Sequence, residues 1–160
     1  MKMRVLSLFA ALAFLTACET APTTGGADAG AGQKVSTAKP ATPGSKEDFI
    51  ANVGDRVFFD FDKSDLRGDA KAQLDKQAEW LKKYPNTKAL IEGHCDERGT
   101  REYNFGLGER RAKATSEYLK AKGIAAARIR MVSYGKERPA VLGSNDAAWA
   151  QNRRTVTVVE

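Results

Sequence analysis

The sequence predicts an α/β fold, a two-layer sandwich in which helices pack on one face of a mixed sheet. Segments with apolar residues at every second position, typical of strands, alternate with segments in which apolar residues recur at helical spacing. Their order is βαβα-β-(α)-β, which favours helices packed together on one side of the sheet. All of these segments fall within residues 47–160, a length that suits one domain.

The first predicted strand covers residues 56–61, and a helix follows over residues 67–84. The strand places three apolar side chains on one face, namely Val57, Phe59 and Phe61. The helix has apolar residues at helical spacing, namely Ala70, Leu74, Ala78 and Leu81. This helix is expected to stop at Tyr84, because the residue before a proline disfavours helical backbone angles.

The remaining predicted elements are a strand over residues 88–94, a long helix over residues 103–122, strands over residues 128–135 and 153–160, and a short helix over residues 145–151. Gly123 is well suited to end the long helix, because glycine readily adopts the left-handed conformation found after helix ends. These elements complete the predicted sandwich.

The N-terminal region predicts export and lipid attachment. Residues 1–17 combine a basic start with an apolar run, typical of a secretory signal peptide and too short for a stable membrane span. The segment LTAC that ends at Cys18 resembles the bacterial lipobox, in which the cysteine is acylated. Glu19 follows, which by the usual sorting rule for such lipoproteins implies the outer membrane. Residues 18–46 are rich in Gly, Ala, Thr and Pro and predict a flexible tether.

Composition argues against several classes of function. The net charge is +6 at pH 7, but 20 acidic residues are interspersed among 26 basic ones, so the basic excess is weak support for nucleic-acid binding. If Cys18 carries lipid, Cys95 has no disulfide partner. We therefore predict no disulfide framework and no nucleic-acid partner.

The segment GHCDERGT at residues 93–100 contains the residue types of a hydrolase active site, but their arrangement argues against one. Catalysis by a Cys/His pair needs the two side chains within hydrogen-bond reach, whereas His94 and Cys95 in an extended segment point to opposite faces. Consecutive residues also do not converge on one metal ion. We therefore predict no catalytic residue, no metal, and no cofactor apart from covalent lipid on Cys18.

Arg111 is the residue that fits its predicted position least well. It lies at the centre of the less polar face of its helix, where a guanidinium is costly to desolvate without partners. One interpretation is that its stem covers the sheet while its charge reaches water. The other is a cleft shared with Asp96, which follows the second strand at the edge where α/β sheets usually build sites. That pair would suit a ligand with an ammonium and a carboxylate on one carbon.

Two segments resemble a known family. They are GHCDERGTREYNFGLGERRAKATSEYLKAKGI, which starts at Gly93, and the later VSYGKERPAVLGSNDAAWAQNRR. Together they resemble the OmpA-like peptidoglycan-binding domain over about residues 55–159. The resemblance implies the OmpA-like C-terminal domain fold. It also implies that Asp96 and Arg111, which match the motifs GH-x-D and L-x-x-x-RA, bind the free amino-acid end of meso-diaminopimelate in the peptidoglycan stem peptide.

By the same resemblance, four further residues line the pocket: Phe61 and Asp62 after the first strand, and Asn104 and Leu107 from the motif YN-x-x-LG. Residues 152–154 match the family's NRR motif and are interpreted as mainly structural near the pocket rim. Cys95 stands where the family more often has Ala or Thr, so we expect that the thiol is not needed for function.

The signal peptide, lipobox and tether are similar to those of the lipoprotein members of this family, which belong to the Tol-Pal system. This implies an outer-membrane lipoprotein with its domain in the periplasm, which binds peptidoglycan and serves envelope integrity and outer-membrane invagination during cell division. It also implies TolB and TolA as partners. The alternative is a lipoprotein that acts chiefly as an interaction module for periplasmic proteins.

Overall fold

Four strands form one mixed sheet in the computed structural model, which describes residues 41–160. The strands are β1 (Arg56–Phe58), β2 (Ala89–His94), β3 (Ile129–Gly135) and β4 (Arg154–Val159). Their order across the sheet is β1-β4-β2-β3; β2 and β3 run parallel, and β4 is antiparallel to both of its neighbours. The predicted signal peptide, Cys18 and residues 19–40 of the predicted tether lie outside the described residues.

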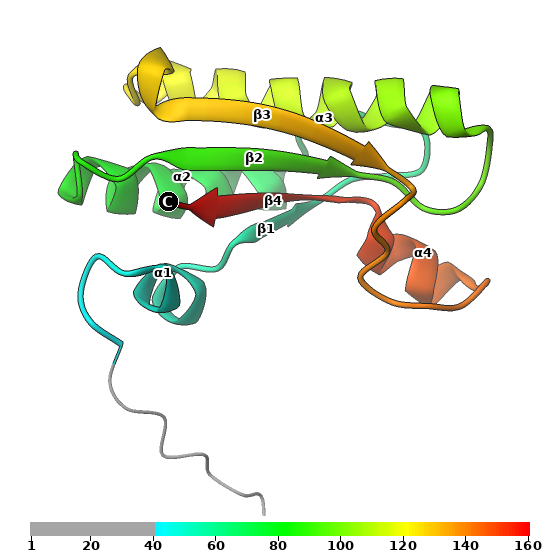
Figure 1. Cartoon of the computed structure of the whole chain (residues 1–160), viewed down its shortest axis with the longest axis horizontal. Helices are drawn as coiled ribbons and strands as arrows, with labels where there is room; N and C mark the ends of the chain where they lie inside the picture. Colours follow the sequence, from blue (N-terminus) through cyan, green and yellow to red (C-terminus); the bar gives the residue numbers. More distant parts are fainter. Residues whose placement is uncertain (1–40) are drawn as a thin grey trace, which may run out of the picture. The chain divides into compact units, whose positions relative to one another are not determined.

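Two long helices cover one face of this sheet, as Figure 1 shows. Helix α2 (Gly68–Lys83) lies against β1, and helix α3 (Arg101–Ala121) lies against β2 and β3. The core between the two layers is made of buried apolar side chains that include Val57, Phe59, Leu74, Leu81, Ile91 and Leu119. The predicted α/β sandwich with helices packed on one face is therefore confirmed.

Most elements begin and end within two residues of their predicted bounds, and side-chain caps explain where α3 and α4 begin. Thr100 Oγ1 accepts a hydrogen bond from Tyr103 N at 3.2 Å, so α3 begins two residues earlier than predicted. Asn145 caps α4 (Asp146–Asn152) in the same way. A 3₁₀ turn, η1 (Ala126–Arg128), leads into β3.

The first strand is shorter than predicted because the chain turns after Phe59. Phe59 is buried in the core, whereas Phe61 is 57% exposed, so the expectation that both lie on one buried face was wrong. Lys63 N donates to Asp60 O at 3.2 Å, and Asp62 has a positive φ of 59°, which marks a tight turn. This turn takes Phe61 away from the core.

A short helix, α1 (Lys46–Asn52), is absent from the predicted elements. The Phe49 ring packs against the Trp80 ring of α2 at 4.9 Å, and Asp48 Oδ2 accepts a hydrogen bond from Trp80 Nε1 at 2.9 Å. Seven residues with one buried side chain show no periodicity in the sequence, and the local signal of this helix is its cap, Ser45, whose Oγ accepts a hydrogen bond from Asp48 N at 3.1 Å. Within residues 41–160, no helix combines the length and the apolar character needed to cross a bilayer.

Helix α3 approaches β2 closely because two glycines face each other. A Cβ added to Gly93 would lie 1.9 Å from the backbone oxygen of Gly108. The register between β2 and β3 shifts directly after Gly93, and Cys95 N then donates to Gly135 O at 2.8 Å. The loop that follows β2 is thereby held against the N-terminal half of α3.

Candidate functional site

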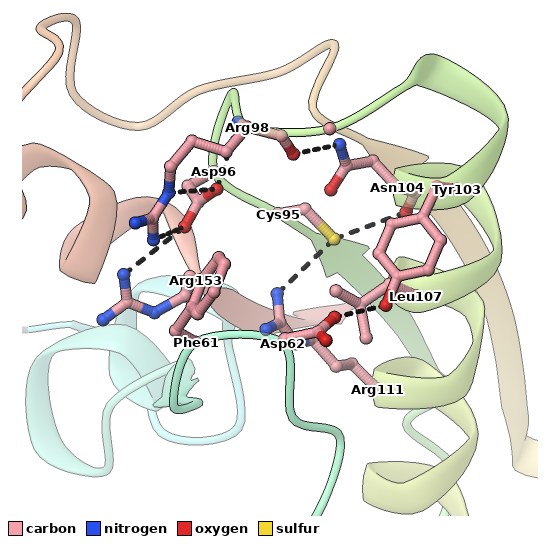
Figure 2. A pocket seen from close by; sticks show the side chains of 11 residues that line it. Phe61, Asp62, Cys95, Asp96, Arg98, Tyr103, Asn104, Leu107, Arg111 and Arg153 are labelled. Carbon is pink, nitrogen blue, oxygen red and sulfur yellow. Dashed lines mark hydrogen bonds and ion pairs between the residues drawn. The ribbon is translucent and has the colours of Figure 1, made fainter.

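A cavity of about 160 Å³ lies where the end of β2, the N-terminal half of α3 and the turn after β1 meet (Figure 2). The six residues predicted to bind a ligand all line it: Phe61, Asp62, Asp96, Asn104, Leu107 and Arg111. Five residues that were not predicted to bind also line it: Cys95, Arg98, Gly99, Tyr103 and Arg153. Folding therefore brings together side chains from three separate parts of the chain.

The Arg111 side chain is completely buried, with 0% of its surface exposed. Its Nε donates to Lys63 O at 2.8 Å, its Nη1 to His94 O at 2.9 Å, and its Nη2 to Asp60 O at 3.1 Å. The interpretation in which this charge reaches water is therefore wrong. Backbone carbonyls replace the water that the guanidinium loses on burial.

The positive charge of Arg111 is not neutralised. Its three oxygen partners are carbonyls, its fourth acceptor is Cys95 Sγ at 3.4 Å from Nη1, and no carboxylate of residues 41–160 forms an ion pair with it. Since a guanidinium has five N–H groups, one hydrogen of Nη2 has no acceptor among these residues. Burial lowers the pKa of Arg111, but a group this basic stays charged.

Asp96 is also enclosed, at 3% exposed, but it is paired with cations. Arg98 Nη2 lies 2.7 Å from Asp96 Oδ2, and the Arg98 backbone N donates to Oδ1 at 3.2 Å. Arg153 Nη1 lies 3.4 Å from Oδ2. Burial acts to raise the pKa of the Asp96 carboxyl, but the hydrogen bonds from Arg98 outweigh it and hold the pKa below its ordinary value. Asp96 is therefore an ionised acceptor beside the cavity.

Two side-chain contacts flank the cavity on opposite sides, with Arg111 between them in Figure 2. On one side, the Arg98 guanidinium lies between two rings, 4.0 Å from the centre of Phe61 and 4.1 Å from the centre of Trp149 in α4. On the other side, the Tyr103 hydroxyl donates to the Asp62 carboxylate. These contacts join α3 and α4 to the loops around the cavity.

Asn104, Leu107 and Arg111 share one face of α3, because spacings of three and four residues return to the same side of a helix. Asn104 Nδ2 donates to the carbonyl oxygens of Arg98 at 2.7 Å and Thr100 at 3.0 Å, so this amide holds the loop after β2 in place. Leu107 is buried and forms an apolar wall of the cavity.

Cys95 and His94 contact different partners, as expected for neighbours in an extended segment. Cys95 Sγ donates to Asn104 O at 3.3 Å and accepts from Arg111, and burial raises the pKa of the thiol, which keeps it neutral. The His94 ring instead lies 5.6 Å from the Tyr134 ring, with Nε2 3.4 Å from Glu92 Oε2. The contact between the thiol and Arg111 was not predicted.

Arg98 and Tyr103 are cavity residues to which the sequence assigned no role, whereas Arg153 was expected near the rim. The interpretation of Arg153 as mainly structural holds only in part, since it donates to Phe59 O at 3.0 Å but also approaches Asp96. A signal for Arg98 was available, because a cation two residues after a carboxylate in a loop can reach back to it. Within residues 41–160, no group of three or more His, Cys, Asp or Glu side chains is placed to hold a metal ion.

The chain is similar to known proteins over most of its length. Residues 58–153 match the OmpA family. The chain is 58% identical over 119 residues to a peptidoglycan-associated lipoprotein of Rhizobium meliloti, covering 74% of this chain and 68% of that protein. It is 47% identical over 131 residues to a peptidoglycan-associated lipoprotein of Pseudomonas aeruginosa, covering 81% of this chain and 76% of that protein.

Solved structures have the same fold. The crystal structure of the peptidoglycan-associated lipoprotein from Burkholderia pseudomallei matches with a TM-score of 0.68 at 39% identity, covering 72% of this chain and 100% of that one. The C-terminal domain of Helicobacter pylori MotB matches with a TM-score of 0.62 at 18% identity, covering 66% and 84%. At that identity the likeness to MotB concerns the fold alone.

Proposed function

This chain belongs to the OmpA family and, within it, to the peptidoglycan-associated lipoproteins, and from this we propose that its cavity binds the diaminopimelate residue of peptidoglycan. The protein is a non-enzymatic, peptidoglycan-binding lipoprotein of the outer membrane with its domain in the periplasm, and it is part of the Tol-Pal system. It thereby links the outer membrane to the cell wall. The family and the function expected from the sequence motifs are confirmed.

The observation that carries the proposal is a buried Arg111 without an ion-pair partner, in one cavity with an ionised Asp96. The free end of meso-diaminopimelate has an ammonium and a carboxylate on the same carbon. The carboxylate would accept from Arg111 Nη2 in a charge-assisted hydrogen bond, and the ammonium would donate to Asp96. Both protein charges then gain an opposite charge, and because both side chains are buried, salt and water screen the attraction only weakly.

The other four predicted residues would shape the cavity around this end of the ligand. Phe61 and Leu107 offer apolar surface to the methylene groups of diaminopimelate. Asp62, held by Tyr103, and Asn104, bonded to the loop after β2, keep the rim in a fixed arrangement before the ligand arrives. A preformed rim lowers the entropy cost of binding.

Sedimentation with purified sacculi tests the assignment of Asp96 and Arg111. We expect full-length protein in detergent to sediment with diaminopimelate-type sacculi and poorly with lysine-type sacculi, because lysine lacks the carboxylate for Arg111. Asp96→Asn and Arg111→Lys should each weaken binding about tenfold or more, since a buried hydrogen bond to a charged group contributes about 1.5–3 kcal/mol.

Asp69→Asn is the matched control, because it removes the same charge from an exposed carboxylate that is paired with Arg67. Thermal unfolding of each variant separates loss of binding from loss of the fold. If the Asp96→Asn/Arg111→Lys double variant sediments like the wild type, the proposed site is wrong.

We also propose that Cys18 carries the lipid that holds the protein at the outer membrane. Each buried CH₂ of an acyl chain contributes about 0.8 kcal/mol, so several chains anchor a protein firmly. Cys18→Ser should move the protein to the soluble fraction, and globomycin should block processing of the wild type. A Cys18→Ser protein that stays in the membrane would exclude this anchor.

Binding of TolB and TolA is a second proposed activity, favoured by exposed apolar side chains near the loop after β2. Leu142 is 87% exposed, and Val141 and Phe61 are also exposed. Grouped apolar residues on a surface are typical of protein interaction sites. Leu142→Ser should weaken capture of purified TolB while binding to sacculi stays unchanged; normal TolB capture by this variant would remove the support for that surface.

A further inference from the structure

Arg98 occupies the position at Asp96 that the ammonium of a ligand would need. We propose that the Arg98 side chain is a displaceable counter-ion, which covers Asp96 in the unliganded protein and leaves it when the ligand ammonium binds. This inference rests on the proposed function of the same cavity, and it assigns to Arg98 a role in controlling entry.

The first support is that the charged groups of Asp96 and Arg111 are covered by neighbouring side chains. Asp96 is 3% exposed and Arg111 is 0% exposed, so an incoming amino-acid end can reach neither charge unless a covering side chain moves. Arg98 makes the shortest side-chain contact with Asp96, through Nη2 at 2.7 Å, and a second through Nε at 3.3 Å (Figure 2). Removing its guanidinium from Asp96 exposes the carboxylate to the ligand.

The second support is that the side chain of Arg98 can move while its backbone stays in place. The backbone N donates to Asp96 Oδ1 at 3.2 Å, and the backbone O accepts from Asn104 Nδ2 at 2.7 Å, so the loop is held at both ends of this residue. The side chain itself is 33% exposed and stacks on the exposed Phe61 ring. Rotation about side-chain bonds, a fast motion, is therefore enough to carry the guanidinium into water.

The third support is the balance of charge at Asp96. Arg153 Nη1 remains 3.4 Å from Oδ2, so Asp96 keeps one cation throughout, and the ligand ammonium replaces the other. The exchange leaves no buried carboxylate without a partner, a state that would be costly. A ligand that carries only a carboxylate cannot make this exchange. Arg98 therefore selects for ligands that also carry an ammonium group.

Trp149 provides a spectroscopic signal for the movement of Arg98. The Arg98 guanidinium lies 4.1 Å from the centre of the Trp149 ring, whereas the other tryptophan, Trp80, is buried beside Phe49 and bonded to Asp48. Displacement of the cation should change the emission of Trp149 and leave that of Trp80 unchanged. Trp149→Phe identifies which tryptophan gives the signal.

The test is stopped-flow fluorescence of full-length protein in detergent, mixed with a purified muropeptide that has a free diaminopimelate end. In the wild type we expect binding with a change in Trp149 emission. In Arg98→Ala and Arg98→Met we expect the emission change to disappear. The association rate constant, measured for all variants by surface plasmon resonance on immobilised muropeptide, should rise by about threefold or more, because the guanidinium no longer competes with the ligand for Asp96. Arg98→Met keeps an apolar side chain between the two rings and guards against a local folding defect.

Arg101→Ala is the matched control, because it removes the same charge from an exposed ion pair with Glu137, and it should bind like the wild type. If the wild type does not bind the muropeptide, the proposed function itself fails. If the wild type binds but both Arg98 variants bind at the wild-type rate, or more weakly, then Arg98 is not a displaceable counter-ion and this inference is overturned.

Discussion

Gly93→Ala tests whether the close contact between β2 and α3 holds the cavity together. The added methyl group would lie 1.9 Å from the Gly108 oxygen and 2.6 Å from its carbonyl carbon. Both atoms belong to the backbone, so no side chain can rotate out of the way. Arg111 follows in the same helix and donates to His94 O at 2.9 Å, so a displaced helix also loses a bond that positions the guanidinium.

The size of the effect follows from that overlap. Real Cβ atoms essentially never approach a neighbour closer than 3.0 Å, so helix and strand must separate by about 1 Å along their tightest contact. Overpacking of a core costs about 1–3 kcal/mol, and the upper end applies where only backbone can yield. We therefore expect the free energy of unfolding to fall by about 3 kcal/mol and Tm to fall by about 10 °C for a domain of this length.

Circular dichroism of full-length protein during heating measures this effect, and Gly106→Ala is the matched control. Gly106 lies in the same helix, but its added Cβ meets only Arg110 Nη1, at 3.5 Å. This control should gain about 0.5–1 kcal/mol, because alanine favours a helix more than glycine does. A Gly93→Ala protein as stable as the wild type would refute the close approach of α3 to β2.

Three further predictions concern buried polar groups. Cys95→Ala removes an acceptor of Arg111, so its free energy of unfolding in urea should fall by about 1 kcal/mol while sedimentation with sacculi stays normal; lost sedimentation with an intact fold would give the thiol a role in binding. Burial, and then the positive charges of Arg154 and Arg138, lower the pKa of His94 from 6.5 to about 4, so the folded state resists protonation. The contribution of neutral His94 to the free energy of unfolding should therefore be fully present above pH 6.5 and decrease as the pH falls towards 4, by up to about 3 kcal/mol. The same pH dependence in His94→Gln would contradict this. Gln77→Leu leaves Thr157 Oγ1 without its acceptor and removes one of the two donors to Gly54 O, so urea unfolding should show a loss of about 2 kcal/mol; an unchanged midpoint would argue against that buried network.

Much of the fold could be predicted because its signals are local. The four apolar positions predicted for the helix over residues 67–84 are all buried, since a helix must turn its apolar face toward the sheet. Proline, glycine and capping residues mark helix ends within a turn. Helix α1 and the turn at Phe61 were not predicted, because α1 is too short to show periodicity and the turn begins within the apolar alternation that predicted the strand.

The candidate site shows the same difference between features that local sequence predicts and features that tertiary contacts decide. Motif resemblance indicated Asp96, Arg111 and four neighbours, and all six line one cavity. The sequence did not predict the partners of these residues. Arg111 is hydrogen-bonded to the backbone of Asp60, Lys63 and His94, and the Arg98 side chain covers Asp96. Such bonds depend on the relative positions of the turn after β1 and helix α3 in the folded protein.

By itself, then, the amino-acid sequence determined the class of fold, the order of its strands and helices, the family and six of the residues that line the pocket. Those properties follow from periodicity and from short motifs, each contained within a few turns of chain. Only the tertiary structure decided that Arg111 is buried without a carboxylate partner among residues 41–160 and that the Arg98 side chain covers Asp96. The physical reason is that burial and pairing of charge depend on all the groups that surround a side chain, and packing of the sheet, α3 and α4 brings those groups together from across the chain.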